Sequence, residues 1–236
     1  MARRHRRSLI TRIPAANVVS RWYLAERFME STLHQHQTKA GVRRALSEAR
    51  RSLPPPERRE RSRRIAGLCR GIAGFSSAEV VCSYVDFREE VETAEFIAEL
   101  LLEGRRVVVP VHEHGTAQPL VFAEIYSLSE MVRNHFGILQ PPRTAARLVP
   151  TAAIPLFLVP GLAFDPAGHR LGYGLGCYDR AFADAAPGAL KVGLAFELQI
   201  LESVPADPHD VPMDFVVTED RVIRAAAGAG SPTRRW

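Results

Sequence analysis

The stretch I-P-L-F-L-V-P-G-L-A-F-D-P-A-G-H-R-L-G-Y-G-L-G-C-Y-D-R, residues 154–180, indicates both the fold and most of the chemistry. It opens with the apolar run Ile154–Val159, which is typical of a strand buried on both faces of a parallel sheet. Pro160 and Gly161 end that strand. The glycine-rich segment behind them is therefore expected at the carboxyl end of the strand, where open α/β sheets bind ligands.

The rest of the chain alternates short apolar runs with segments of helical spacing. This pattern predicts an α/β fold, a three-layer sandwich with a mostly parallel central sheet and additional N-terminal helices. Besides 154–159, strands are expected at Val80–Val85, Val107–Val111, Leu120–Ile125 and Lys191–Phe196, with an edge hairpin at Phe215–Thr218 and Val222–Ile223. Helices are expected at Lys39–Ser52, Glu57–Ile72, Thr93–Leu102 and Tyr178–Ala183.

The charge of the chain is unevenly distributed. Residues 1–64 hold 17 of the 31 basic and 5 of the 26 acidic residues, a net of +12, whereas the remainder has a net charge of −7. The positive charge of the whole chain is therefore weak evidence for a nucleic-acid partner, because that charge lies in the first 64 residues. The arginines between 58 and 64 are typical of a solvated helix face. The three cysteines are too far apart for a disulfide framework or a zinc site.

Three ranges follow from the composition. We expect an Arg-rich extension at 1–37, an α/β domain at 38–225 and a flexible tail at 226–236. For the extension, a disordered tail, a start at Met29 and an organelle transit peptide are alternatives, while the apolar core of a secretory signal is absent. No apolar run has the length of about 18 residues that suggests a membrane span.

Three glycines alternate in G-Y-G-L-G, from Gly172 to Gly176. Such spacing lets backbone amides face one concavity, which favours a phosphate. Asp179 follows closely, and a carboxylate beside a phosphate is a usual partner of Mg²⁺. A tight turn without a ligand is the alternative. A dinucleotide fingerprint would need glycine in place of Cys177, and the G-K-[ST] of a Walker A loop does not occur.

The stretch resembles the signature of the 5-formyltetrahydrofolate cyclo-ligase family, P-G-x-x-F-D-x-x-G-x-R-L-G-x-G-x-G-x-Y-D. The matching residues are Pro160, Gly161, Phe164, Asp165, Gly168, Arg170, Leu171, Gly172, Gly174, Gly176, Tyr178 and Asp179. The resemblance extends in order over residues 39 to 220, with further matches at Lys39 and Arg43, Glu90–Thr93, Gly104–Pro110, Phe136–Pro141, Gln199, His209–Asp210 and Asp214–Thr218. It implies ATP- and Mg²⁺-dependent closure of 5-formyltetrahydrofolate to 5,10-methenyltetrahydrofolate, with release of ADP and phosphate.

The resemblance also implies roles for individual residues. Catalytic roles fall to Arg170, Tyr178 and Asp179, and Mg²⁺ ligation falls to Asp179 and Asp210. Nucleotide binding falls to Lys39, Arg43, Arg170, Leu171, Gly172, Tyr173, Gly174, Leu175, Gly176, Cys177 and Tyr178. Folate binding falls to Tyr84, Glu90, Phe164 and Tyr178. For Asp165 the alternative is a structural role, in which its carboxylate bonds the backbone of its own loop.

Departures from the signature define the alternatives. The family usually has an aromatic residue where Cys177 stands, and often basic residues at Tyr173 and Leu175. A degenerate member that binds nucleotide, with another or no folate substrate, is therefore the first alternative. A nucleic-acid-associated protein is the second, and the glycine spacing disfavours a nicotinamide-dependent dehydrogenase. We expect small-molecule substrates, no nucleic acid, no membrane partner, a monomer and a cytoplasmic location, with organelle import as an open alternative.

Overall fold

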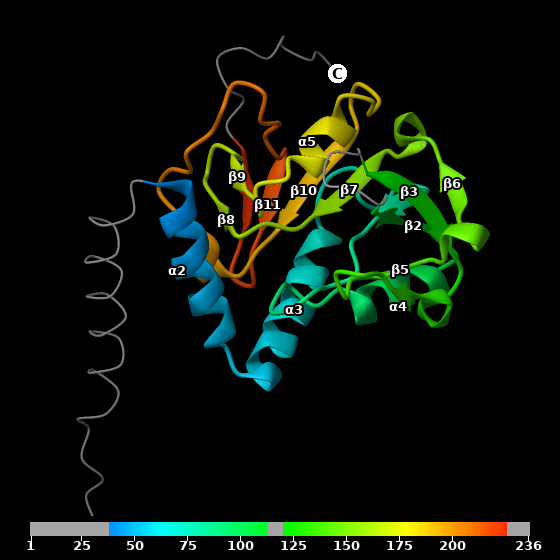
Figure 1. The fold of residues 1–236 in the computed structure, drawn as a ribbon, viewed down its shortest axis with the longest axis horizontal. Helices are drawn as coiled ribbons and strands as arrows, with labels where there is room; N and C mark the ends of the chain where they lie inside the picture. Colours follow the sequence, from blue (N-terminus) through cyan, green and yellow to red (C-terminus); the bar gives the residue numbers. More distant parts are fainter. Residues whose placement is uncertain (1–37, 113–119, 226–236) are drawn as a thin grey trace, which may run out of the picture. The chain divides into compact units, whose positions relative to one another are not determined.

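Figure 1 shows the fold in a computed structural model, which describes residues 38–112 and 120–225. By its contacts the chain divides into a unit of residues 42–236 and a small unit of residues 1–41, of which 38–41 are described. The predicted extension, residues 1–37, and the predicted tail, residues 226–236, lie outside the described residues. The domain boundaries therefore stay predictions.

An eight-stranded sheet forms the centre of the larger unit (Figure 1). Five neighbouring strands run parallel, and antiparallel pairs add one strand at one edge and two at the other. This confirms the mostly parallel sheet and the hairpin predicted at its edge. The order is β12 (Val222–Arg224), β11 (Phe215–Val217), β10 (Leu190–Leu194), β7 (Leu156–Val159), β1 (Val80–Cys82), β2 (Arg106–Val111), β3 (Val121–Ile125) and β6 (Arg147–Val149).

The two faces of the sheet bury different hydrophobic cores. Along β7, Leu156 and Leu158 belong to one core, while Phe157 and Val159 belong to the other, as the alternation of a strand requires. The first core is completed by helices α3 (Pro55–Cys69) and α4 (Ala94–Leu102), and the second by α5 (Cys177–Phe182). Helices thus cover both faces, which is the predicted three-layer sandwich.

A small hairpin carries the centre of the signature. Its strands are β8 (Ala163–Phe164) and β9 (Arg170–Leu171), which pair antiparallel. Helix α2 (Lys39–Arg51) packs on this hairpin through Leu46, in a cluster with Ala163 and Leu171. The helix therefore lies directly against the segment that the sequence singled out.

Several short elements were not predicted. They are β4 (Val132–Arg133) paired with β5 (Leu139–Gln140), strands β6, β8 and β9, and the 3₁₀ turns η1 (Leu128–Glu130), η2 (Arg143–Ala145), η3 (Thr151–Ala153) and η4 (Glu197–Gln199). Two or three residues are too few to show a hydrophobic period. Helix α3 also begins earlier than expected, at Pro55, since proline fits the first turn, which needs no N–H donor.

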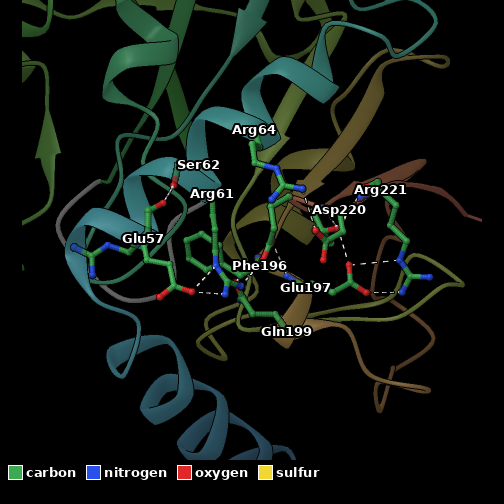
Figure 2. Close-up of polar contacts among 12 residues, drawn as sticks. Glu57, Arg61, Ser62, Arg64, Phe196, Glu197, Gln199, Asp220 and Arg221 are labelled. Atoms are coloured by element: carbon green, nitrogen blue, oxygen red, sulfur yellow. Dashed lines mark hydrogen bonds and ion pairs between the residues drawn. The ribbon is translucent and has the colours of Figure 1, made fainter. Parts of the chain in front are cut away.

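The arginines of α3 pair with carboxylates from several elements. Arg58 lies 3.0 Å from Glu92, and Arg61 bonds the buried Glu219 in the turn between β11 and β12. Arg64 reaches Asp220 in the same turn, as Figure 2 shows. Further pairs join Arg59 to Glu92, and Arg63 to Glu60 and Glu95. These charges are neutralised within the fold, which favours the solvated helix face over a nucleic-acid site.

The described helices include none that combines the length and apolar character needed to span a membrane.

A steric contact under the hairpin generates the first testable prediction. A Cβ atom added at Gly193 in β10 would lie 2.4 Å from the Phe164 ring, so Gly193→Ala should destabilise the fold by about 1–3 kcal/mol. Gly67→Ala is a matched control, because Gly67 lies in α3 with no atom near its added Cβ, and it should stabilise by about 0.5–1 kcal/mol. Urea unfolding of both variants checks the opposite signs; equal effects would contradict the contact.

Candidate active site

The strand order creates a topological switch point between β1 and β7. These strands are neighbours, but the next strand after β1 is β2 on one side, whereas β7 is followed across the sheet by β10 on the other. Ligands of open α/β sheets bind outside the carboxyl ends of strands at such a point. The loop after β1 carries Glu90, and the chain after β7 leads into the glycine-rich segment. Segments about 80 residues apart therefore converge on one site.

The glycine segment adopts backbone angles that are unfavourable for residues other than glycine. Gly174 and Gly176 have φ values of 99° and 60°, in the left-handed region that favours glycine. Arg43 of α2 donates from Nε to the Gly172 carbonyl at 2.8 Å, and its guanidinium lies 3.1 Å from where a Gly174 Cβ would be. The structure thus brings Arg43 onto the glycine segment. Lys39 begins α2 but belongs to the small N-terminal unit, so its place in the site stays a prediction.

The variable positions of the segment face different surroundings. Tyr173 is half-exposed, but its hydroxyl accepts a hydrogen bond of 3.0 Å from the buried Arg50. Leu175 is also about half-exposed and lies between two glycines. Cys177 begins α5, and its Sγ lies 3.7 Å from a guanidinium nitrogen of Arg180. None of these three side chains supplies a positive charge to the segment.

Arg170 and Asp179 form an ion pair beneath the segment. Arg170 Nη2 donates to Asp179 Oδ1 at 3.0 Å, and the Val211 N–H donates to the same oxygen at 3.2 Å. The Arg170 guanidinium carbon also lies 5.3 Å from the centre of the Tyr178 ring. Among the described residues, the buried side-chain atoms without a hydrogen-bond partner are Arg170 Nη1, the Tyr178 hydroxyl and the Nε atoms of Arg50, Arg105 and Arg147. A polar ligand at Arg170 and Tyr178 would complete the hydrogen bonds of those two groups.

Glu90 is a buried carboxyl group of unusual proton affinity. The Phe87 N–H donates to its Oε2 at 3.1 Å, across a turn in which Arg88 adopts a positive φ of 56°. Burial raises the pKa of Glu90 to about 7, although the Phe87 N–H and the charge of Arg50 act in the opposite direction. Burial likewise raises the pKa of Tyr178 well above its usual value, so the phenol stays protonated. Glu90 can therefore give or take a proton near neutrality.

Asp210 lies in a small polar cluster. Its Oδ2 accepts the Asp207 N–H at 2.8 Å, and ligand atoms of Asp207, His209 and Asp210 lie within 4.8 Å of one another. The next residue, Val211, is the one that bonds Asp179. Asp210 and Asp179, both predicted to bind Mg²⁺, are thus linked through the backbone N–H of the residue after Asp210. A shared metal site stays a prediction.

Two residues predicted to contact folate are buried. The Phe164 ring is fully buried against Gly161 and Gly193, and Tyr84 is 3% exposed with its hydroxyl bonded to the Val91 carbonyl. Their contact with folate stays a prediction. Asp165 accepts the N–H groups of Ala167, His169 and Val204, and thus ties down its own loop.

Arg50 is a site residue that the sequence analysis missed. It lies in the last turn of α2, is 2% exposed and donates to the Gly161 carbonyl as well as to Tyr173. Residues 43, 46 and 50 lie on one face of a helix, since they are spaced by three and four. That spacing, beginning at Arg43, is the signal that could have found it.

Comparisons with known proteins point to one family. The model of the 5-formyltetrahydrofolate cyclo-ligase family matches residues 35–219. The 5-formyltetrahydrofolate cyclo-ligase of Mycolicibacterium smegmatis is 33% identical over 192 residues, which cover 80% of this chain and 97% of that protein. That of Escherichia coli K12 is 30% identical over 178 residues, 75% of this chain and 98% of the relative.

A solved structure shows the same fold. The 5,10-methenyltetrahydrofolate synthetase of Aquifex aeolicus superposes with a TM-score of 0.70 at 29% identity, covering 83% of this chain and 96% of that one. The matched region includes every element that forms the candidate site, from α2 to the end of β11. The chain therefore belongs to the 5-formyltetrahydrofolate cyclo-ligase family.

Proposed function

We propose that this chain closes 5-formyltetrahydrofolate to 5,10-methenyltetrahydrofolate, using ATP and Mg²⁺ and releasing ADP and phosphate. The observation that carries the proposal is the convergence of Glu90 and the glycine segment at the switch point of the sheet. The two relatives named above are called 5-formyltetrahydrofolate cyclo-ligases, and this chain matches nearly the whole length of each. We expect a cytoplasmic monomer that acts on small-molecule substrates.

The reaction joins a phosphoryl transfer to a ring closure. The formyl oxygen attacks the γ-phosphorus of ATP, and ADP leaves. N10 of the folate then attacks the activated formyl carbon and loses its proton, the C–O bond breaks, and phosphate departs as the ring closes. In phosphoryl transfer a protein acts chiefly by positioning groups and stabilising charge. The residues of the site are therefore assigned by where they can hold negative charge.

The glycine segment and its arginines suit a triphosphate. The backbone of residues 172–176 can turn amides towards an anion, as glycine-rich segments do. Arg43 already lies on this segment, and Arg170 has one buried nitrogen, Nη1, without a partner among the described residues. We assign both to the phosphates, with Lys39 as a further cation. Leu171, Leu175 and Cys177 would contact the nucleotide through their backbone or apolar atoms.

The donor set next to the arginines suits Mg²⁺. Asp179 Oδ1 accepts hydrogen bonds from Arg170 and Val211, while no described residue bonds its Oδ2. Carboxylate oxygens are the ligands that Mg²⁺ prefers, commonly one or two with several waters. We assign Asp179 and Asp210 to the ion, directly or through water. Bound there, Mg²⁺ would neutralise phosphate charge during transfer.

Glu90 and Tyr178 suit the folate end of the site. The protonated Tyr178 hydroxyl has no partner among the described residues, so it can donate to the formyl or phosphate oxygen. We assign Glu90 to accept N–H groups of the pterin and, with its pKa raised to about 7 by burial, to hold a proton beside N5. Aromatic contact with the pterin falls to Tyr178 in this assignment, because Phe164 and Tyr84 are enclosed.

The activity itself is the first prediction of this section. Purified protein with 5-formyltetrahydrofolate, ATP and Mg²⁺ should produce the absorbance band of methenyltetrahydrofolate. Omitting ATP or chelating the metal should abolish the rise. A flat trace from a protein that binds ATP by calorimetry would instead favour the degenerate member.

A second prediction concerns the charge of Asp179. Asp179→Asn keeps an oxygen for Arg170 and Val211 but removes the negative charge that would face the metal. Turnover should fall on the order of 100-fold, with a higher Mg²⁺ requirement in a protein that still folds. Asp184→Asn is the matched control, since Asp184 is exposed at the end of α5 and should behave as wild type. Wild-type turnover by Asp179→Asn would remove this residue from the metal site.

A third prediction follows from the proton of Glu90. Its folded pKa of about 7 lies above the ordinary value of 4.5, so its stabilisation is present below pH 4.5 and is lost as pH rises through 7. Between pH 5 and pH 8, wild type should lose roughly 2–3 kcal/mol more stability than Glu90→Gln. Urea unfolding at both pH values measures the difference. Parallel pH dependence of the two proteins would place the Glu90 pKa near its ordinary value.

A further inference from the structure

Helix α2 holds the glycine segment with two arginines of different character. Arg43 bonds the Gly172 carbonyl from a half-buried position, whereas Arg50 is buried and reaches the next side chain, Tyr173, at its hydroxyl. The second hydrogen bond of Arg50 goes to the Gly161 carbonyl, 3.3 Å from Nη1. That carbonyl follows the end of β7 and also accepts Gln199 Nε2 at 2.9 Å. Arg50 thus joins the backbone just after β7 to the glycine segment.

The charge of Arg50 is not neutralised by a close partner. None of the described carboxylates lies within ion-pair distance, and Glu90 acts on it only through longer-range electrostatics. Burying a guanidinium without a carboxylate is costly, and its hydrogen bonds must offset that cost. The Tyr173 hydroxyl is one of these bonds. Arg50 Nε is already buried without a partner among the described residues, so loss of that hydroxyl would leave a second donor of the same guanidinium unsatisfied.

The segment needs an anchor, because its glycines leave it flexible. Gly172, Gly174 and Gly176 have few conformational restrictions, and ordering such residues costs more entropy than ordering others. Tyr173 is the one residue of the segment whose side chain bonds another element, among those described. A preformed segment would bind phosphate with less of this ordering cost. Because Tyr173 lies between Gly172 and Gly174, fixing its side chain also restricts the backbone of both glycines.

We infer that Arg50 is a positioning residue of the nucleotide site, which holds the segment 172–176 in its phosphate-binding conformation through the Tyr173 hydroxyl. We call the link from the Gly161 carbonyl through Arg50 to the Tyr173 hydroxyl the clasp. The identity of the ligand rests on the proposed function, while the clasp itself rests on these two hydrogen bonds of Arg50. Arg50 touches neither nucleotide nor folate in this assignment. Its effect is therefore expected on nucleotide affinity rather than on the chemical step.

The clasp is tested first without any ligand. Amide hydrogen exchange of residues 171–178 should become several-fold faster in Tyr173→Phe and in Arg50→Lys than in wild type. Tyr126→Phe and Arg105→Lys are matched controls, since Tyr126 is an exposed tyrosine outside the site and Arg105 is a half-buried arginine that bonds the Phe75 and Ala78 carbonyls. Unchanged exchange in Tyr173→Phe would overturn the inference, whatever the protein catalyses.

Nucleotide affinity is the second readout. Calorimetry with Mg·ATP should give Tyr173→Phe a Kd about 3- to 10-fold weaker than wild type, the effect expected for a lost hydrogen bond to a charged group. In turnover, KM for ATP should rise by the same factor with kcat nearly unchanged. Arg50→Lys should weaken binding similarly, and adding Tyr173→Phe to it should have little further effect.

The outcomes separate the two proposals. Equal factors for Tyr173→Phe in the wild-type and Arg50→Lys backgrounds would show that the residues act independently, and would overturn the clasp. A fall in kcat with unchanged KM would also overturn it. Absence of Mg·ATP binding by wild type would overturn the proposed function, while the exchange measurement would still decide the clasp. Tyr173→Phe keeps the buried guanidinium, so the test holds even if Arg50→Lys fails to fold.

Discussion

The packing of one aromatic ring against two glycines is the constraint on which the site depends. Phe164 lies over Gly193 of β10 and beside Gly161, so closely that a Cβ at either glycine would fall within 2.6 Å of the ring. This contact seats the β8–β9 hairpin directly on the sheet. Arg170 lies on β9, and the glycine segment follows immediately. The packing of the hairpin on β10 therefore sets where Arg170 and the glycine segment lie.

Buried charge is the second feature of the site, and it opposes stability. Glu90, Arg50 and Arg170 are each largely removed from water, and they are only partly compensated by neighbours. Such groups destabilise a fold unless another group completes their hydrogen bonds. Their concentration at the switch point indicates that a ligand would supply those bonds. Natural sites commonly retain strained or unsatisfied groups because function requires them.

The sequence predicts the sheet well because its central strands are buried on both faces. Continuous apolar runs such as Val107–Val111 need no tertiary information to be recognised. The glycine segment and Asp179 are equally legible, since their chemistry lies in consecutive residues. Phe164 is different, because an aromatic residue within the signature can face either a ligand or the core. Arg50 is hardest, since burial of an arginine depends on partners more than 100 residues away, such as Gly161 and Tyr173.

The departures from the family signature become intelligible once Arg50 is seen. The resemblance leads one to expect basic side chains at positions 173 and 175, but Tyr173 and Leu175 bring no charge. The positive charge lies instead on α2, where Arg50 stands at the hydroxyl of Tyr173 and Arg43 at the carbonyl of Gly172. A charge on the helix is held in place by packing, whereas one on the glycine segment would move with it. The chain thus combines a glycine-rich backbone segment with positive charge held on a packed helix.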